Sequence, residues 1–110
     1  MAARLSTSVL VSALIRKAEA EGGFAAILAK GDERAGSVIL ILTERGADPH
    51  IFERVLQANG TYGWQETSPT PIEAVPDLIA KRRRFDPDIW ALELDVPSWE
   101  RFAAEMISPD

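Results

Sequence analysis

The spacing of apolar residues predicts an amphipathic helix near the start of the chain, over residues 8–21. Val11, Leu14, Ile15 and Ala18 recur at the i, i+3, i+4 and i+7 spacing that places side chains on one helical face. Charged residues lie off this stripe. The glycine pair that follows predicts the end of the helix, because glycine adopts the left-handed conformation of a helix C-terminus without steric cost.

Four strands are predicted in close succession, over residues 24–30, 37–43, 50–57 and 62–67. The second contains the uninterrupted apolar run 38–42, which indicates burial on both faces and hence a central position in the sheet. A polar loop is predicted over residues 44–49. Because strands joined by short turns usually pair with their sequence neighbours, we expect these four to form an antiparallel meander.

The turn between the first two strands carries two glycines, Gly31 and Gly36. Glycines at this spacing also occur in phosphate-binding loops, but the lysine and the following helix that phosphate binding requires are missing here. We therefore predict a hairpin turn in which both glycines adopt positive φ angles.

A second helix is predicted between Pro71 and Arg84, followed by a fifth strand over residues 89–94. Pro76 either kinks this helix or follows a separate single turn, because proline disfavours helical geometry at the residue before it. A last helix opens at Pro97. Its apolar face carries Trp99, Phe102, Ala103 and Met106.

Together these elements predict a single α+β domain over residues 1–110, in the order α-β-β-β-β-α-β-α. The sheet is five-stranded and mainly antiparallel, with the helices mostly on one face. We expect the first and second helices on that face and the last helix over an edge or end. The other face would then be partly polar or paired with a second copy, which suggests a homodimer.

The composition excludes several classes of protein. The chain has no cysteine, which rules out disulfides, thiolate zinc sites, iron–sulfur clusters and cysteine nucleophiles. No apolar run is long enough to span a membrane, and the first residues do not resemble a signal peptide. We expect a soluble cytoplasmic protein without a cofactor or a membrane association.

The net charge of −5 is confined to the second half of the chain. Residues 1–60 carry seven basic and seven acidic side chains, whereas residues 61–110 carry five basic and ten acidic ones. Four of those five basic residues form the run Lys81–Arg84. A nucleic-acid binder normally spreads positive charge over a whole face, so this local block argues against general nucleic-acid binding.

The basic run has two interpretations. It could bind phosphate, another anion or an acidic partner. Alternatively, its cations end a helix, where they face the negative end of the helix dipole and pair with neighbouring carboxylates. We favour this structural interpretation, because surface charge runs are usually solvated. Arg82 and Arg83 are the members that we expect to be exposed.

A carboxylate cluster follows the basic run. Asp86, Asp88 and Glu93 flank or occupy the fifth strand, and with Arg84 they could form the site of an acid–base enzyme. Such chemistry needs one carboxyl group with a raised pKa in an apolar pocket, and no spacing in the sequence supplies that pocket. The alternative is that Asp86 and Asp88 end the helix and begin the strand. Glu93 would face solvent or pair with an arginine.

The lone histidine and one tryptophan complete the candidate residues. His50 has Asp48 and Glu53 nearby, but on a strand residues 48 and 50 point to one side and 53 to the other. We therefore predict a surface histidine and no metal site. Trp64 lies on a short polar strand beside Tyr62, and we predict that it is an exposed aromatic residue.

Several segments resemble a small bacterial family, the domain of unknown function 1491. They are residues 11–16, the Gly-Gly-Phe-Ala sequence 22–25, residues 30–32 with 35–36, the Arg-Phe-Asp-Pro-Asp-Ile-Trp sequence 84–90, and Glu93. The resemblance covers nearly the whole chain. It implies a compact alphaproteobacterial domain and brings no activity and no catalytic residue.

Three functional hypotheses remain. The first is a non-enzymatic binding or regulatory module that acts through contacts with an unidentified protein partner or a second copy. The second is anion or nucleic-acid binding centred on Lys81–Arg84. The third is a carboxylate–arginine enzyme that uses Arg84, Asp86, Asp88 and Glu93. The absence of a recognisable catalytic motif favours the first.

Overall fold

The computed structural model describes residues 6–67 and 69–107 of the 110-residue chain. The elements in this described part are α1 (Thr7–Ala20), β1 (Phe24–Ala29), β2 (Val38–Glu44), β3 (Ala47–Leu56), β4 (Tyr62–Glu66), the 3-10 turn η1 (Ile72–Ala74), α2 (Val75–Phe85), β5 (Trp90–Asp95) and α3 (Trp99–Ile107). The α+β class and the predicted order of helices and strands are confirmed. None of the helices described is both long and apolar enough to cross a membrane.

The strands form one five-stranded sheet in the order β1-β5-β2-β3-β4. β5 lies between β1 and β2, antiparallel to β1 and parallel to β2. The remaining pairings, β2 with β3 and β3 with β4, are antiparallel, so the sheet is mainly antiparallel as predicted. The expected meander of four strands was wrong in one respect, because β1 pairs with β5 instead of β2.

The loop between β1 and β2 packs across the beginning of β5. The backbone N–H of Asp32 donates to the carbonyl of Asp88 at 3.0 Å, and the Trp90 indole donates to the Asp32 carbonyl at 2.7 Å. A Cβ atom added at Gly31 or Gly36 would lie 2.1 or 2.3 Å from the Asp88 carbonyl oxygen. Neither glycine has a positive φ angle, so the predicted hairpin turn was wrong. Both glycines are needed because two backbone segments approach closely.

The connection between β2 and β3 is also tighter than the polar loop 44–49 that we predicted. The two strands extend into this segment, and only Arg45 and Gly46 join them. Both residues are left-handed, with φ angles of 54° and 73°, as in the tight hairpin turns that match the twist of paired strands. The Asp95 carboxylate accepts both of their backbone N–H groups, at 2.9 and 2.7 Å.

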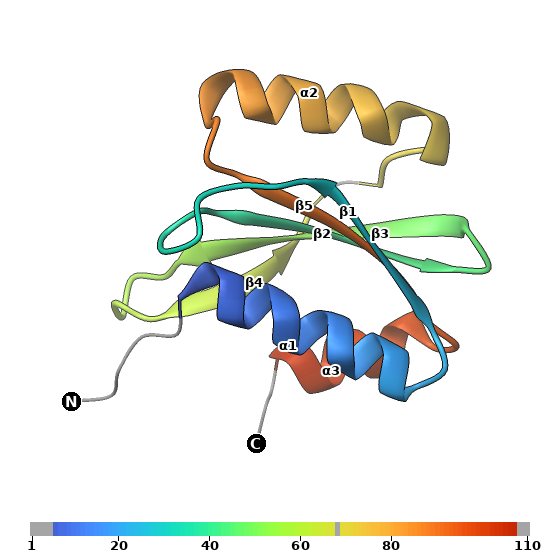
Figure 1. Ribbon diagram of the computed structural model, residues 1–110. Coiled ribbons are helices and arrows are strands. Elements are labelled where there is room, and N and C mark those ends of the chain that lie inside the picture. The colour runs from blue at the N-terminus through green and yellow to red at the C-terminus, as the bar shows by residue number, and fades with distance from the viewer. Residues whose placement is uncertain (1–5, 68, 108–110) are drawn as a thin grey trace.

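Helices cover both faces of the sheet (Figure 1). α1 and α3 lie on one face and α2 lies on the opposite face. Two of the three helices therefore share a face as predicted, but the pair is α1 with α3 and not α1 with α2. The expectation of a face left open for a second copy loses its basis, because α2 covers much of that face.

β2 is the central strand, as its apolar run predicts. All of its residues from Val38 to Thr43 are buried. Leu40 and Leu42 belong to the core layer under α1 and α3, whereas Ile41 belongs to the layer under α2. Alternation along one strand thus supplies both hydrophobic layers.

The region around Pro76 follows the first of the two alternatives. A single 3-10 turn, η1, precedes α2, and Pro76 lies in the first turn of that helix. The missing N–H of proline has no helical partner to lose at this position, so the residue is tolerated. α2 then runs along the sheet and returns the chain to β5 (Figure 1).

Candidate functional site

The basic run ends α2, and one of its arginines is already engaged. The Arg82 guanidinium contacts both carboxylate oxygens of Glu53 on β3, at 2.6 and 2.8 Å. Glu53 is half-buried, so this bidentate pair ties the helix to the sheet. Lys81, Arg83 and Arg84 are exposed in the last turns of the helix, where cations are favoured by the helix dipole. Arg82 is exposed too, but its charge is already paired with Glu53.

Asp86 and Asp88 build the connection from α2 to β5. The N–H of Asp86 donates to the carbonyl of Arg82 at 2.9 Å, and the Asp86 carboxylate accepts the N–H of Asp88 at 3.1 Å. Asp88 provides the carbonyl against which the β1–β2 loop packs. These contacts fit the structural interpretation of the two residues, because both organise the backbone where the helix ends and the strand begins.

Glu93 lies apart from that connection, in the middle of β5. It is half-buried, and its carboxylate accepts a hydrogen bond from the Thr43 hydroxyl at 3.3 Å. With a strand rise of about 3.3 Å per residue, it lies about 10 Å from the first residue of β5. Within the described residues, no hydrogen bond or ion pair joins Glu93 to Arg84, Asp86 or Asp88. The four residues are therefore not assembled into one polar site.

Trp64 is not the exposed aromatic residue that we predicted. It is half-buried and packs against the core layer that lies under α1 and α3. Its neighbour Tyr62 is 45% exposed, with the Arg54 guanidinium 5.1 Å from its ring centre. The prediction failed because the polar composition of β4 does not reveal that α3 covers one of its faces.

The single histidine lies beside a cleft that the sequence did not reveal. His50 stacks on Trp99, with ring centres 3.5 Å apart and planes inclined by 13°, and its Nδ1 lies 3.1 Å from Glu66. The cleft has a volume of about 830 Å³ and lies between the β2–β3 turn, residues 69–73 and Trp99. Among the described residues, no group of three or more histidines and carboxylates is placed to hold a metal ion. The stack joins β3 to the start of α3.

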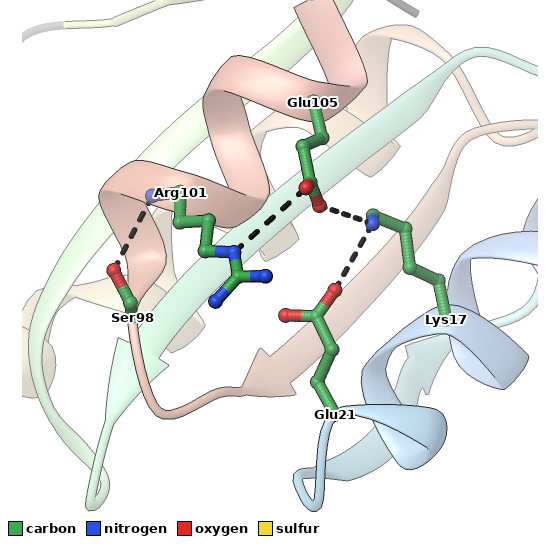
Figure 2. A network of polar contacts seen from close by, with 5 residues as sticks. All are labelled: Lys17, Glu21, Ser98, Arg101 and Glu105. Atoms are coloured by element: carbon green, nitrogen blue, oxygen red, sulfur yellow. Dashed lines mark hydrogen bonds and ion pairs between the residues drawn. The ribbon is translucent and has the colours of Figure 1, made fainter.

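A polar network joins α1 to α3 (Figure 2). Lys17 Nζ lies 2.5 Å from Glu105 Oε1 and 3.0 Å from Glu21 Oε2. Arg101 lies 3.8 Å from the other Glu105 oxygen, and its backbone N–H donates to the Ser98 hydroxyl. The hydrogen bond to Glu105, followed by that to Glu21, raises the pKa of Lys17. The same contact with Lys17 lowers the pKa of Glu105.

β1 forms an edge of the sheet, and its side chains are all apolar. Phe24, Ile27 and Leu28 are 76%, 52% and 43% exposed. Among the described strands β1 pairs only with β5, so its other side presents backbone N–H and C=O groups outward. The opposite edge strand, β4, is one residue shorter and ends in Gln65 and Glu66. β1 is thus the less protected of the two edges.

A sequence model described as "Protein of unknown function (DUF1491)" matches residues 5–104. The chain belongs to the DUF1491 family. The resemblance found in the sequence is thereby confirmed over nearly the whole chain.

Solved structures of other proteins share the fold of this DUF1491 protein. A crystal structure and an NMR structure of a DUF1491 protein from Caulobacter crescentus are 34% and 35% identical, with TM-scores of 0.73 and 0.78. The two matches extend over 90% and 92% of this chain. In both cases they extend over 94% of the C. crescentus chain. The solution structure of an Agrobacterium tumefaciens protein is 28% identical, with a TM-score of 0.76. This match extends over 91% of the present chain and 92% of the A. tumefaciens chain. Both organisms are alphaproteobacteria, as the resemblance implies.

No curated protein matches this DUF1491 chain. The family description states no activity, so the comparisons supply a fold and no catalytic residue.

Proposed function

We propose that this DUF1491 protein is a non-enzymatic binding module that acts through protein contacts, with the outer edge of β1 as its contact surface. The observation that carries the proposal is an apolar edge strand that has neither charge nor proline. Soluble proteins usually protect such edges with charged side chains, prolines or covering elements, because an open edge accepts a strand from another chain. An edge that lacks these devices is suited to strand addition.

The side chains of β1 add a hydrophobic contribution to the backbone hydrogen bonds. Complete burial of a phenylalanine or isoleucine side chain contributes about 1.5–3 kcal/mol. In the isolated chain, most of the Phe24 surface and about half of the Ile27 surface are exposed to solvent. They alternate along the strand and so point to opposite faces of the sheet. An added strand would therefore cover apolar surface on both faces.

The contacts of the polar candidates support this choice. Arg82 is engaged with Glu53, the Asp86 carboxylate accepts a backbone N–H, and the Glu93 carboxylate accepts a threonine hydroxyl. These contacts are structural, whereas the β1 edge has exposed groups that lack an evident structural purpose.

Capture experiments with the tagged full chain test the proposal. In Ile27→Lys, a charge is placed on the exposed edge, and in the control Ala104→Lys the same charge is placed on an exposed site of α3. After cross-linking in cells of the source organism, the wild type and the control should capture the same chains, and Ile27→Lys should lose them. Equal capture by Ile27→Lys, or no captured chain of any kind for the wild type, would contradict the proposal.

A further inference from the structure

We infer that the last turn of α2 carries a second contact site, which binds a short stretch of single-stranded nucleic acid. The site consists of Lys81, Arg83, Arg84 and Phe85, which we call the α2 patch. All four side chains are exposed, and α2 is the outer layer on its face of the sheet (Figure 1). The α2 patch shares no residue with the β1 edge, so each proposal can fail without the other.

Phe85 is an aromatic ring that the fold leaves in solvent. It is 83% exposed, more than any other large hydrophobic side chain in the described part of the chain. Lys81, Arg84 and Phe85 have the i, i+3, i+4 spacing that places side chains on one side of a helix. A ring flanked by cations is the combination that binds single-stranded nucleic acid, because a base stacks on the ring while the cations contact phosphates.

The cations of the α2 patch are not used by the fold. The basic run spends one member on an ion pair, that of Arg82 with Glu53 on β3. Over residues 6–67 and 69–107, no ion pair joins Lys81, Arg83 or Arg84 to a carboxylate, although Asp77 lies only one turn before Lys81. The pairing that a purely structural role would use is therefore missing for these three cations, and their charges are available to an external anion.

The single ring favours a nucleic acid over a lipid surface. Helices that bind membrane surfaces insert a continuous apolar face. In α2 the apolar residues Val75 and Ile79 are buried against the sheet, so Phe85 is left as an isolated apolar side chain at the end of the helix. One ring is enough to stack one base. In a duplex the bases stack on one another, so the α2 patch should select unpaired bases.

The charge of the molecule limits the length of the contact. The chain has a net charge of −5, and positive charge is dense only in the basic run, so the contact should span a few nucleotides. This agrees with the sequence argument against general nucleic-acid binding. Each cation that neutralises a phosphate of a single strand changes the slope of log binding constant against log salt by about −0.7. Three cations therefore predict a slope of about −2.

Fluorescence anisotropy of a labelled oligothymidylate and a labelled oligouridylate, over a series of salt concentrations, tests the electrostatic part. The wild type should bind both with a slope of about −2, and should bind the thymidylate strand less tightly after it is annealed to its complement. Lys81→Ala combined with Arg84→Ala should reduce the slope to about −0.7. Arg16→Ala, at an exposed site on α1, is the matched control and should leave the slope unchanged.

A pair of phenylalanine variants tests the stacking part. Phe85→Ala should weaken binding about fivefold or more and leave the salt slope unchanged, because stacking releases no counterions. Phe24→Ala is the matched control, since Phe24 is 76% exposed and lies on β1 without a basic run beside it. It should bind the oligonucleotides like the wild type. Because Phe24 belongs to the β1 edge, this control also separates the inference from the proposed function.

Three results would overturn the inference. One is the absence of saturable binding of both oligonucleotides at low salt. The second is unchanged binding by Phe85→Ala, and the third is an unchanged salt slope in the Lys81→Ala, Arg84→Ala variant. Retention of the wild type on phosphatidylglycerol vesicles without oligonucleotide binding would assign the α2 patch to a lipid surface and would equally contradict the inference. Circular dichroism of each variant checks that the fold is intact.

Discussion

At the scale of single residues, backbone proximity decides which glycines are indispensable. Gly31 and Gly36 hold the β1–β2 loop against the carbonyl of Asp88, where a methyl group has no room. Gly60, in contrast, has a φ angle of 85° in a turn with open space around it. The two situations are physically different, because one involves steric overlap with another segment and the other a local backbone preference.

This difference predicts unequal effects of alanine. Gly31→Ala should lower the free energy of unfolding by about 3 kcal/mol or more, because the loop must move away from β5. Gly60→Ala should lower it by about 1 kcal/mol, which is typical of a left-handed alanine. Urea denaturation of both variants measures the difference. Equal losses would show that the loop does not pack as tightly as described.

The Arg82–Glu53 pair allows a second residue-scale prediction. Because Arg82 is partly exposed, the coupling free energy should be modest, about 1 kcal/mol, in a double-mutant cycle of Arg82→Ala and Glu53→Gln. Arg83→Ala, on the adjacent exposed position, should show no coupling to Glu53→Gln. A coupling near zero for Arg82 would remove its structural role and return it to the anion-binding hypothesis.

At the scale of elements, the network of Lys17, Glu21 and Glu105 makes the docking of α3 depend on pH. The pKa of Glu105 is lowered in the folded state, so its contribution to stability is present above the ordinary pKa of 4.5 and lost as the pH falls through the folded value. The pKa of Lys17 is raised, so its contribution is present below 10.5 and lost as the pH rises through the folded value.

Removal of one carboxylate should flatten the acid side of this profile. Glu105→Gln should lower stability near neutral pH, and this loss should shrink as the pH falls through the folded-state pKa of Glu105 and the wild-type carboxyl becomes protonated. Glu100→Gln is a matched control on α3, since Glu100 is exposed and outside the network. Urea titrations at a series of pH values from neutral to acid test this. A loss that stays constant over the whole series would mean that the network does not contribute.

The same scale shows what the sequence could and could not predict. The spacing of Val11, Leu14 and Ala18 predicted α1, and the apolar run of β2 predicted a central strand. Local pattern carries such information, because burial repeats along each element. The insertion of β5 between β1 and β2 depends on contacts between distant segments, and no local pattern encodes it. The association of α1 with α3 was missed for the same reason.

The same limit applies to the candidate functional residues: local sequence patterns identify a residue but not the distant residues that it contacts. Arg82 was singled out by its position in a charge run, but its partner Glu53 lies on another element, so the pair could not be seen in the sequence. Trp64 looked exposed because its strand is polar, and α3 covers it. His50 and Trp99 meet only after folding. The apolar composition of residues 24–29 was visible in the sequence. Only the strand order showed that this apolar strand lies at an edge of the sheet.

At the scale of the whole molecule, the two sheet edges are not equivalent. β4 is short and carries polar side chains, whereas β1 presents an uncharged strand and exposed Phe24 and Ile27. α1 and α3 cover one sheet face and α2 covers much of the other. The β1 edge is therefore a major part of the apolar surface that stays exposed in the described structure. The account therefore places the contact with another chain at β1.

Amide hydrogen exchange, followed residue by residue in the protein alone and in its complex with a captured chain, tests this claim most directly. Alternate amides of β1 point away from β5 and should exchange rapidly in the protein alone. We expect these amides of Phe24–Ala29 to become protected in the complex, while exchange along β4 stays unchanged. Equal exchange of the β1 amides in the two states would contradict the claim.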